Sequence, residues 1–375
     1  MTFQDLAAEL FEAMELGAEE PLSEPAFNDL ALRVFRFQCH ENQLYRGFVT
    51  RRGVNPEAVT SWREIPFLPT RAFKSAKLVS GNPGSVDRVF RTSGTTRGQL
   101  NRGEHHVLDL DLYRHSLLGN FARHLLRSTH DRMRILCLLP SSEAAPDSSL
   151  AFMMDEVVRG FGSHGSGFFV GPDGEIDEGA FWTALRYVER LGEPVLLAGT
   201  AFGFVRWLET GEKGPRRVSL PPGSRIMETG GYKGRSREVP REEFYEILEE
   251  GFGVGANFIV NEYGMTELLS QFYEPVLGGG EHPGVLGLAD RYHRGPPWVR
   301  TLSLDPMTLD EVPLGERGIL AHLDLANLGS VSAVLTEDLG RMVPGGFQLL
   351  GRNPGSEPRG CSLAMEDFLS GRGFR

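Results

Sequence analysis

The feature that most constrains the fold is a regular alternation of short apolar runs and helix-length amphipathic segments between residues 107 and 260. The apolar runs occupy residues 135–139, 168–170, 195–198, 225–227 and 258–260, and the helical patterns occupy residues 107–127, 149–160, 179–191, 201–209 and 241–250. Short apolar strands separated by helices of this length predict an α/β fold in which helices cover both faces of the sheet.

The flanks of this region have different patterns. Helical periodicity covers residues 2–16 and 26–48, whereas short β runs punctuated by Gly and Pro follow residue 280, at 317–323, 331–335 and 347–350. We therefore expect one core domain over residues 1–350, with a β-rich subdomain at about 281–350, and a short hinge and tail over residues 351–375.

Charge and cysteine usage exclude several classes of protein. The 375-residue chain has a formal net charge of -11 with Arg and Glu interspersed, which argues against broad contact with nucleic acid. No apolar stretch approaches the ~18 residues of a membrane span, and no basic leader precedes an apolar segment. Cys39, Cys137 and Cys361 are too scattered for a disulfide framework or a zinc site. We expect a cytoplasmic protein in which Cys39 and Cys137 are core residues.

The strongest local motif is the loop at residues 91–98, which reads RTSGTTRG. Hydroxyl groups, glycines and free backbone N–H groups make such a loop suitable for wrapping a phosphate, although its spacing is not that of a Walker A loop. A surface turn rich in Ser and Thr has the same composition, so the loop alone leaves both interpretations open.

Two further segments follow apolar runs. Residues 261–267, NEYGMTE, bring an aromatic ring, a hydroxyl and two carboxylates to a strand end, where open α/β sheets bind ligands. Tyr263 could stack on a base and Glu267 could help hold Mg²⁺, or the segment could be a helix start capped by Thr266 or Glu267. In residues 336–340, TEDLG, Asp338 could bind a ribose diol or cap its own tight turn.

Taken in order, five motifs carry a resemblance to a known superfamily. The sequence SGTT at 93–96, Gly230-Gly231, YGMTE at 263–267, TEDLG at 336–340 and Gly351-Arg352 resemble the core motifs of the adenylate-forming enzymes: acyl-CoA synthetases, luciferases and peptide-synthetase adenylation domains. Residues 65–69 with Phe73-Lys74, 91–96, 229–233 and 351–363 are similar to the acyl-protein synthetase (luciferin-component ligase) family of the bacterial luminescence fatty-acid reductase.

This resemblance implies a fold and a set of ATP-binding residues. The fold would be the adenylate-forming N-terminal core, with helix-covered sheets and a small β subdomain. By resemblance, the phosphates would contact Thr92, Ser93, Gly94, Thr95, Thr96 and Gly98; the adenine pocket would contain Gly230, Gly231, Tyr232, Tyr263 and Gly264; Thr266 would touch the α-phosphate, Glu267 would bind Mg²⁺, and Asp338 and Arg352 would hold the ribose. The implied cofactors are ATP and Mg²⁺.

One departure from the superfamily pattern is large. Only 23 residues, without any Lys, follow Gly351-Arg352, so we expect the C-terminal lid domain and its catalytic Lys to be essentially absent. Lys233 could supply the missing cation, or it could be a solvated surface Lys beside Arg235 and Arg237.

Cys361 would then accept the acyl group, because a thiolate captures an acyl adenylate without further activation. The alternative is a small buried side chain beside Leu363. By family layout, Phe202 and Phe204 would bind the acid, although both also suit an ordinary apolar helix face.

The predicted function is ATP-dependent activation of a carboxylic acid, by resemblance a fatty acid, as an acyl adenylate. The acyl group would pass to Cys361 and then to a reductase partner. An acid–amine ligase, an acid–CoA ligase and a non-catalytic nucleotide-binding protein are the alternatives.

Overall fold

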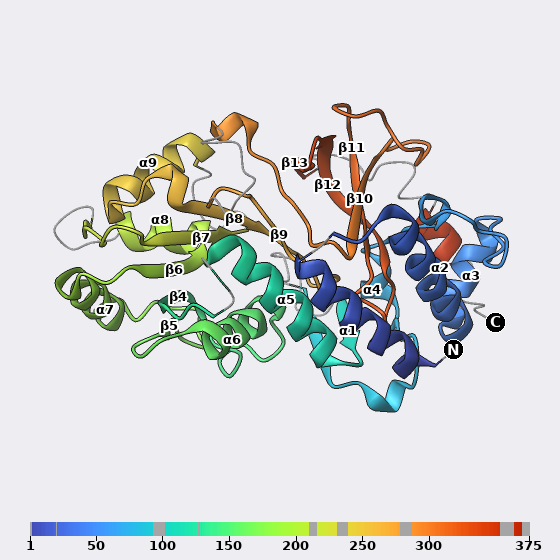
Figure 1. The fold of residues 1–375 in the computed structure, drawn as a ribbon, viewed down its shortest axis with the longest axis horizontal. Coiled ribbons are helices and arrows are strands. Elements are labelled where there is room, and N and C mark those ends of the chain that lie inside the picture. Colours follow the sequence, from blue (N-terminus) through green and yellow to red (C-terminus); the bar gives the residue numbers. More distant parts are fainter. Residues whose placement is uncertain are drawn as a thin grey trace. The chain divides into compact units, whose positions relative to one another are not determined.

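The computed structural model describes the chain except for residues 1, 20, 93–101, 127, 129, 210–215, 231–238, 278–286, 353–363 and 370–375. It divides into two compact units (Figure 1). Unit 1 comprises Met1–Leu117, Met265–Gln271 and Tyr292–Arg375, and unit 2 comprises Leu118–Gly264 and Phe272–Arg291. Both combine helices and sheets, which confirms the α/β class. The division of the chain into a core at 1–350 and a tail at 351–375 stays a prediction.

Unit 2 is built on a six-stranded sheet in the order β5-β4-β6-β7-β8-β9. Its first five strands are parallel, and β9 runs antiparallel to β8. The strands are β4 (Arg134–Pro140), β5 (Gly167–Val170), β6 (Val195–Thr200), β7 (Arg225–Thr229), β8 (Ile259–Tyr263) and β9 (Phe272–Tyr273). The helices are α6 (Ser149–Phe161), α7 (Glu178–Leu191), α8 (Ala201–Glu209), α9 (Arg241–Phe252) and the short η3 (Ala256–Phe258) and η4 (Leu288–Asp290), while α5 (Leu110–Leu125) begins in unit 1.

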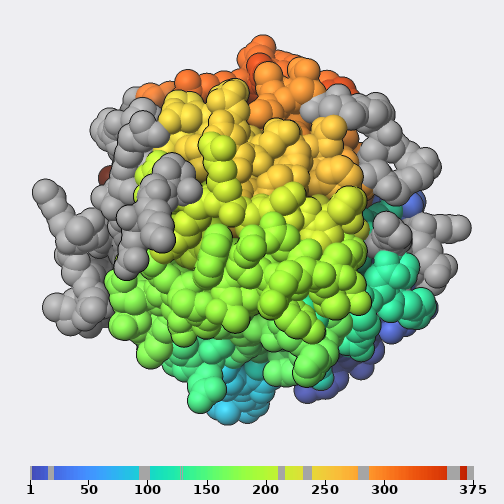
Figure 2. Space-filling model, turned by 90° about the vertical axis from the view of Figure 1, so that its left-hand side faces the viewer, coloured from blue at the N-terminus to red at the C-terminus, as the bar shows by residue number. Residues whose placement is uncertain are grey.

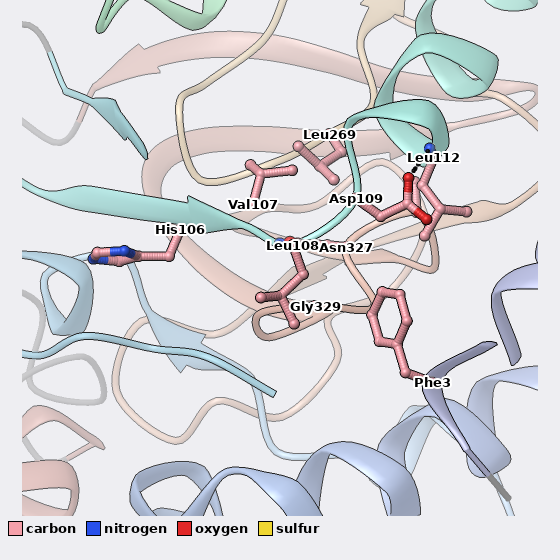
Figure 3. Close-up of a pocket in the computed structure, with 10 residues that line it drawn as sticks. Phe3, His106, Val107, Leu108, Asp109, Leu112, Leu269, Asn327 and Gly329 are labelled. Carbon is pink, nitrogen blue, oxygen red and sulfur yellow. Dashed lines mark hydrogen bonds between the residues drawn. The ribbon is translucent and has the colours of Figure 1, made fainter. Parts of the chain in front are cut away.

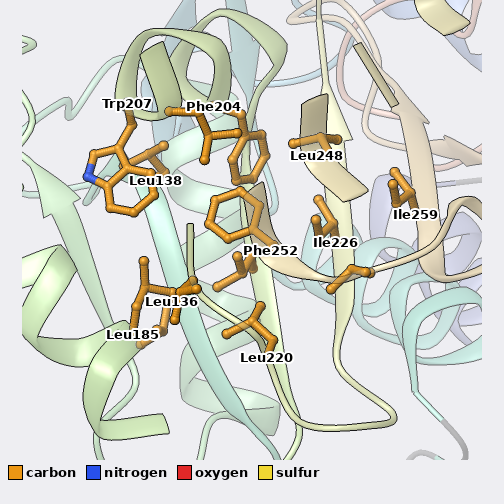
Figure 4. Close-up of a cluster of buried hydrophobic side chains, with 14 of the residues drawn as sticks. Leu136, Leu138, Leu185, Phe204, Trp207, Leu220, Ile226, Leu248, Phe252 and Ile259 are labelled. Carbon is orange, nitrogen blue, oxygen red and sulfur yellow. The ribbon is translucent and has the colours of Figure 1, made fainter. Parts of the chain in front are cut away.

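Helices cover both faces of this sheet, as the sequence pattern predicted. Helices α8 and α9 lie on one side and α6 on the other (Figure 1). One apolar cluster joins the sheet to α7, α8 and α9 through side chains such as Leu136, Phe204 and Phe252 (Figure 4). Burial of these side chains contributes about 1.5–3 kcal/mol each, so the cluster fixes the strand ends that carry the functional motifs.

Helix α7 belongs to the part of unit 2 that is light green in Figure 2, and some of its apolar side chains are exposed. Trp182, Tyr187 and Leu191 are 36%, 48% and 41% exposed. The guanidinium of Arg134 lies 4.9 Å from the centre of the Tyr187 ring, and that of Arg186 lies 5.9 Å from the Trp182 ring. Cation–π contacts therefore cover part of this aromatic surface.

Unit 1 contains a five-stranded sheet in the order β1-β12-β11-β10, with β13 paired to β12. Its strands are β1 (Leu68–Pro69), β10 (Val299–Leu304), β11 (Arg317–Asp324), β12 (Ala333–Val343) and β13 (Gly346–Arg352), and a separate hairpin is formed by β2 (Arg88–Arg91) and β3 (Glu104–Val107). Its helices are α1 (Phe3–Glu19), α2 (Glu24–Glu41), α3 (Gln43–Arg51), α4 (Ala72–Ser75), η1 (Trp62–Glu64) and η2 (Pro83–Ser85).

Two local predictions differ from the structure. The helical pattern at 26–48 is divided at Asn42, whose backbone leaves helical geometry and whose side chain caps α3 by accepting a hydrogen bond from Tyr45 N at 3.1 Å. Asp338 does not lie in a tight turn, because β12 continues through it to Val343. Gly340 permits this, since a Cβ there would lie 2.6 Å from Leu320 Cδ2 and 2.8 Å from the Gln348 carbonyl oxygen.

The two described cysteines, Cys39 and Cys137, are buried and free, as expected of core residues. Burial raises the pKa of Cys39 to about 12 and raises that of Cys137 further. Both thiols are therefore protonated and unreactive at neutral pH. Among the helices of the described residues, none has the length and apolarity needed to cross a membrane.

Candidate functional site

The predicted phosphate loop lies in the connection between β2 and β3 in unit 1, which starts after Arg91 and ends before Glu104. Thr92 N donates to the Gly103 carbonyl at 2.9 Å, and Gly103 N donates to Thr92 Oγ1 at 2.9 Å. Arg102 Nε adds a bond of 2.6 Å to the Thr92 carbonyl. These contacts fix the two points where the chain leaves and rejoins the hairpin. Ser93, Gly94, Thr95, Thr96 and Gly98 lie outside the described residues.

Lys74 lies close to this point. Both Thr92 and Lys74 border Gly103: a Cβ placed on this glycine would lie 3.2 Å from Thr92 Cγ2 and 3.4 Å from Lys74 Cγ. Lys74 is exposed at the end of α4. Its neighbour Phe73 is buried and packs edge-on against His105, with ring centres 5.7 Å apart. The side-chain stem of Lys74 thus lies beside Thr92, near the start of the predicted phosphate loop.

Glu267 is a buried carboxyl group in unit 1, with 7% of its surface exposed. Burial raises its pKa to about 7, although a hydrogen bond with its own backbone and the charges of Lys74 and Arg352 act in the opposite direction. A carboxyl group that is costly to ionise, with cations around it, is common in functional sites. Thr266, the preceding residue, is half-buried.

Asp338 and Arg352 face each other across the β12–β13 ladder of unit 1. Arg352 Nε donates to Asp338 Oδ1 at 3.3 Å. The Arg352 side chain is 73% exposed and the Asp338 side chain 12% exposed, so this ion pair contributes little to stability. The two residues predicted to hold the ribose therefore lie side by side, and their role stays a prediction. Asp338 also contributes to the electrostatic environment of Glu267.

In unit 2, the three predicted adenine residues that the structure describes, Gly230, Tyr263 and Gly264, lie at the carboxyl ends of adjacent parallel strands. Thr200, Thr229 and Glu262 are in register at the ends of β6, β7 and β8. Gly230 follows β7 with φ +66°, a left-handed conformation that glycine adopts without strain. Tyr263 ends β8, and its ring lies 5.7 Å from that of Phe272. The next residue, Gly264, is exposed. Ligands bind at this edge of open α/β sheets.

Two buried carboxyl groups support the same edge. Thr229 Oγ1 donates to Glu262, and burial raises the pKa of Glu262 to about 7. Burial likewise raises the pKa of Glu228 to about 7, while Asn261 Nδ2 and Tyr245 Oη donate to Glu228 Oε1 at 2.6 and 3.1 Å. The ends of β7 and β8 are thereby cross-linked by side chains.

The two candidate acid-binding residues lie in different surroundings at the end of β6. Phe204 is fully buried in the apolar cluster, where its ring contacts Phe252 at 5.9 Å (Figure 4). Phe202 is half-buried. Strand β6 adjoins β4, where the strand order reverses, and such a switch point is a common ligand site in α/β sheets. The acid-binding role of both residues stays a prediction.

The remaining predicted site residues, Gly231, Tyr232, Lys233 and Cys361, lie outside the described residues. The chain after Cys361 is anchored in unit 1, because a helix at 364–369 buries Ala364 and Phe368 completely. Arg52 Nη1 lies 3.4 Å from Asp367 Oδ2 of the same helix. The segment at 353–363 therefore joins the end of β13 to an anchored helix.

The sequence predictions missed the polar residues that hold the Thr266–Glu267 backbone in unit 1. His105 and Asn327 are buried and bond to the carbonyl oxygens of Thr266 and Glu267. A histidine inside a short strand and an asparagine in a turn have no distinctive local pattern. They could have been found from their spatial proximity, which the sequence alone did not supply.

A pocket beside these residues is lined mainly by apolar groups, including Leu108, Leu269 and Phe3 (Figure 3). Its carboxylate, Asp109, already accepts hydrogen bonds from Asp111 N at 2.8 Å and Leu112 N at 3.2 Å at the start of α5. Within the described part of the chain, no group of three or more His, Cys, Asp or Glu side chains is placed to hold a metal ion.

Comparisons with known proteins identify the family and the fold. A family model described as "Acyl-protein synthetase, LuxE" matches residues 3–370. Two curated relatives are named long-chain-fatty-acid--luciferin-component ligase. The Vibrio harveyi protein is 26% identical over 357 residues, covering 90% of this chain and 86% of the relative. The Aliivibrio fischeri protein is 25% identical over 358 residues, covering 91% and 88%.

Solved structures with the same fold include 2-hydroxyisobutyryl-CoA ligase. Its open conformation, in complex with 2-HIB-AMP and CoA, has a TM-score of 0.59 at 14% identity and covers 86% of this chain and 73% of its own. Its postadenylation state, in complex with 2-HIB-AMP, has a TM-score of 0.60 at 15% identity, with 88% and 67% covered. The adenylate-forming fold predicted from the sequence is confirmed. Since the family model spans nearly the whole sequence, this chain belongs to the acyl-protein synthetase, LuxE, family.

Proposed function

We propose that this chain uses ATP and Mg²⁺ to convert a long-chain fatty acid into an acyl adenylate and then passes the acyl group to its own Cys361. Membership of the family makes it an AMP-forming acid–thiol ligase. The long-chain substrate is proposed because both curated relatives are named as ligases of long-chain fatty acids.

The observation that carries the proposal is the gathering of charged groups in unit 1 near the start of the predicted phosphate loop. Lys74 lies beside Thr92, and Lys74, Arg352 and Asp338 all contribute to the electrostatic environment of Glu267. Adenylation requires neutralisation of phosphate charge and alignment of the carboxylate with the α-phosphorus, and these groups provide cations for the first task.

The proposed reaction has two balanced steps. In the first, an oxygen of the acid carboxylate attacks the α-phosphorus, a new P–O bond forms, and pyrophosphate leaves. In the second, the Cys361 thiolate attacks the acyl carbon, the thioester bond forms, and AMP leaves with the electron pair of the broken C–O bond. Each step transfers charge to a phosphate group, so cations near the phosphates stabilise both leaving groups.

Glu267 fits the role of a Mg²⁺ ligand. Mg²⁺ in nucleotide sites is commonly held by one or two carboxylates together with phosphates and water, so a single buried carboxylate suffices. The raised pKa of Glu267 means that a bound cation would also favour loss of its proton. When bound, Mg²⁺ would neutralise phosphate charge.

Two lysines are candidates for the catalytic cation. Lys233 is the candidate from the family layout, and Lys74 is the candidate within the described residues. Lys74 lies near Thr92 and acts electrostatically on Glu267, which favours a contact with the phosphates.

Cys361 is proposed as the acceptor because the other thiols cannot serve. Cys39 and Cys137 are buried with raised pKa values, so neither forms a thiolate readily. Cys361 lies nine residues after Arg352, the proposed ribose ligand, and a chain of this length reaches up to about 30 Å. A protein thioester is an intermediate, and we propose a reductase as the partner that removes the acyl group.

Because Cys39 and Cys137 are free thiols, we also propose that the reaction takes place in the cytoplasm.

The test is ATP–pyrophosphate exchange measured over a panel of acids that differ in chain length and aromaticity. Exchange stimulated by fatty acids of long chain length, and weakly by short or aryl acids, is the expected result. Absence of exchange with every acid would favour a non-catalytic nucleotide-binding protein. If the protein exchanges pyrophosphate but the final product is an acyl-CoA or an amide, the adenylation step stands and Cys361 is not the acceptor.

A further inference from the structure

Three buried polar side chains of unit 1, which we call the 266–270 clamp, hold the segment that begins with the last two residues of the YGMTE motif. They are His105 at β3 and Asp324 and Asn327 at the end of β11 and in the following turn. Asp324 accepts hydrogen bonds from Leu269 N and Ser270 N at 2.9 Å each and from Ser270 Oγ at 2.7 Å. The clamp therefore fixes the C-terminal half of the segment through its backbone N–H groups.

The other half of the segment is held through its carbonyl groups. His105 Nδ1 donates to the Thr266 carbonyl oxygen at 2.6 Å, since a carbonyl can only accept. Asn327 Nδ2 donates to the Glu267 carbonyl oxygen at 2.9 Å and to the Val331 carbonyl oxygen at 2.9 Å. The backbone of the two residues expected nearest the α-phosphate and Mg²⁺ is thus bonded to two buried side chains.

The orientation of Asn327 is determined by its own partners. Its amide nitrogen faces two carbonyl oxygens, so its Oδ1 must face His105 Nε2, at 2.8 Å. A flipped amide would set an oxygen against both carbonyls and lose two hydrogen bonds. His105 is in turn packed against the ring of Phe73, next to Lys74. Burial lowers the pKa of His105 to about 4, so at neutral pH the ring has one N–H and donates to one of its two acceptors, the Thr266 carbonyl. His105 packs between Phe73 and Asn327 and so connects Thr266 to α4, while Asn327 holds Glu267 through its own amide.

A second buried amide supports the same turn without touching the segment. Gln38 Nε2 donates to the carbonyl oxygens of Asn327 and Leu328 at 2.9 and 3.0 Å, and its Oε1 accepts from Ser332 N and Ser332 Oγ at 3.0 and 2.9 Å. Gln38 is fully buried and makes more hydrogen bonds than Asn327. It is a matched control, because its removal perturbs the turn but leaves the bonds to Thr266 and Glu267 in place.

We propose that His105 and Asn327 are positioning residues for adenylation, which hold the Thr266–Glu267 backbone so that the Thr266 hydroxyl and the Glu267 carboxylate meet the phosphates. This inference rests on the proposed function. It assigns no contact with substrate to either residue. Both act through Thr266 and Glu267, and their hydrogen bonds set the geometry of those two side chains before ATP binds.

The expected effect follows from the sensitivity of catalysis to geometry. A misplacement of about 1 Å at a reacting group can lower the rate about 10²-fold. We expect His105→Phe, which retains a ring to pack against Phe73, and Asn327→Ala to lower the kcat of acid-dependent pyrophosphate exchange by about this factor. The KM for ATP should change less, because the loop at 91–98 and the ribose residues are unaltered.

The experiment compares these variants with Gln38→Ala and with His105→Gln. Stability is measured by chemical denaturation, and local order by the hydrogen exchange of residues 265–271. Gln38→Ala should lose at least as much stability as Asn327→Ala and keep its kcat within a few-fold. His105→Gln keeps an amide donor for Thr266 and should recover part of the lost activity. His105→Phe and Asn327→Ala should accelerate hydrogen exchange in residues 265–271 more than Gln38→Ala does.

Activity that falls in proportion to stability in all variants, including Gln38→Ala, would reduce the clamp to a structural role and overturn the proposal. Unchanged kinetics of pyrophosphate exchange in both His105→Phe and Asn327→Ala would overturn the proposal as well. If the wild-type protein exchanges no pyrophosphate, the proposed function fails. The hydrogen-exchange comparison still decides whether the two side chains hold the segment, and a segment that stays protected in both variants contradicts the inference.

Discussion

Replacement of Glu262 by Gln should remove part of the pH dependence of stability. Glu262 is 4% exposed at the end of β8, and its described partner is the Thr229 hydroxyl. Gln has the same size and can accept the same hydrogen bond, but it carries no proton that is lost between acid and neutral pH. The variant therefore isolates the effect of one buried carboxyl group.

The magnitude follows from the raised pKa. Burial raises the pKa of Glu262 from 4.5 to about 7. Between these values the folded protein keeps a proton that the unfolded chain has released, so the free energy of unfolding falls as the pH rises. The contribution is fully present below pH 4.5 and is lost as the pH passes through about 7. The full difference amounts to roughly 3 kcal/mol.

The assay is urea denaturation at pH 5 and pH 8 for wild type, Glu262→Gln and the control Glu246→Gln, which changes an exposed residue of α9. The wild type should lose stability from pH 5 to pH 8, with Glu228 contributing to the same trend. Glu262→Gln should lose roughly 2–3 kcal/mol less than the wild type over this range. An equal loss in wild type and Glu262→Gln would mean that Glu262 is ionised in the folded protein at both pH values.

Three further predictions concern the site. Asp338→Ala should abolish measurable pyrophosphate exchange while the far-ultraviolet circular dichroism stays unchanged, because this side chain pairs with the exposed Arg352; normal exchange would remove it from the site. Lys74→Ala should slow adenylation by about 10²-fold in single-turnover assays whereas the control Lys77→Ala does not, and equal rates in both variants would count against Lys74. Lys233→Ala should slow adenylation about 10²-fold if Lys233 supplies the positive charge that stabilises the transition state. If Lys233→Ala adenylates at the wild-type rate and Lys74→Ala is slow, that role belongs to Lys74.

The parallel sheet of unit 2 could be predicted from the sequence because its elements are local and periodic. The helix predicted at 201–209 matches α8, and the run at 135–139 lies inside β4. Each of these segments shows its burial in its own pattern of apolar residues. The same holds for Cys137, whose place inside an apolar run predicted a core position.

The sheet of unit 1 was harder to predict because distant segments form it. Strand β1 has two residues and pairs with β12, so its partner lies far along the sequence. Asp338 and Gly340 are typical turn residues, yet both lie within β12, where Gly340 allows close packing of the neighbouring strands. His105 and Asn327 were missed for a related reason: their hydrogen bonds join residues that are far apart in the chain.

The most direct test of the central claim is incubation of the wild-type protein and Cys361→Ser with ATP, Mg²⁺ and a labelled long-chain fatty acid. We predict that both proteins exchange pyrophosphate and that only the wild type carries label released by neutral hydroxylamine, since the thiol acts after adenylation. Label on the serine variant that hydroxylamine still releases, or a wild type that exchanges pyrophosphate without acquiring label, would contradict acyl transfer to Cys361.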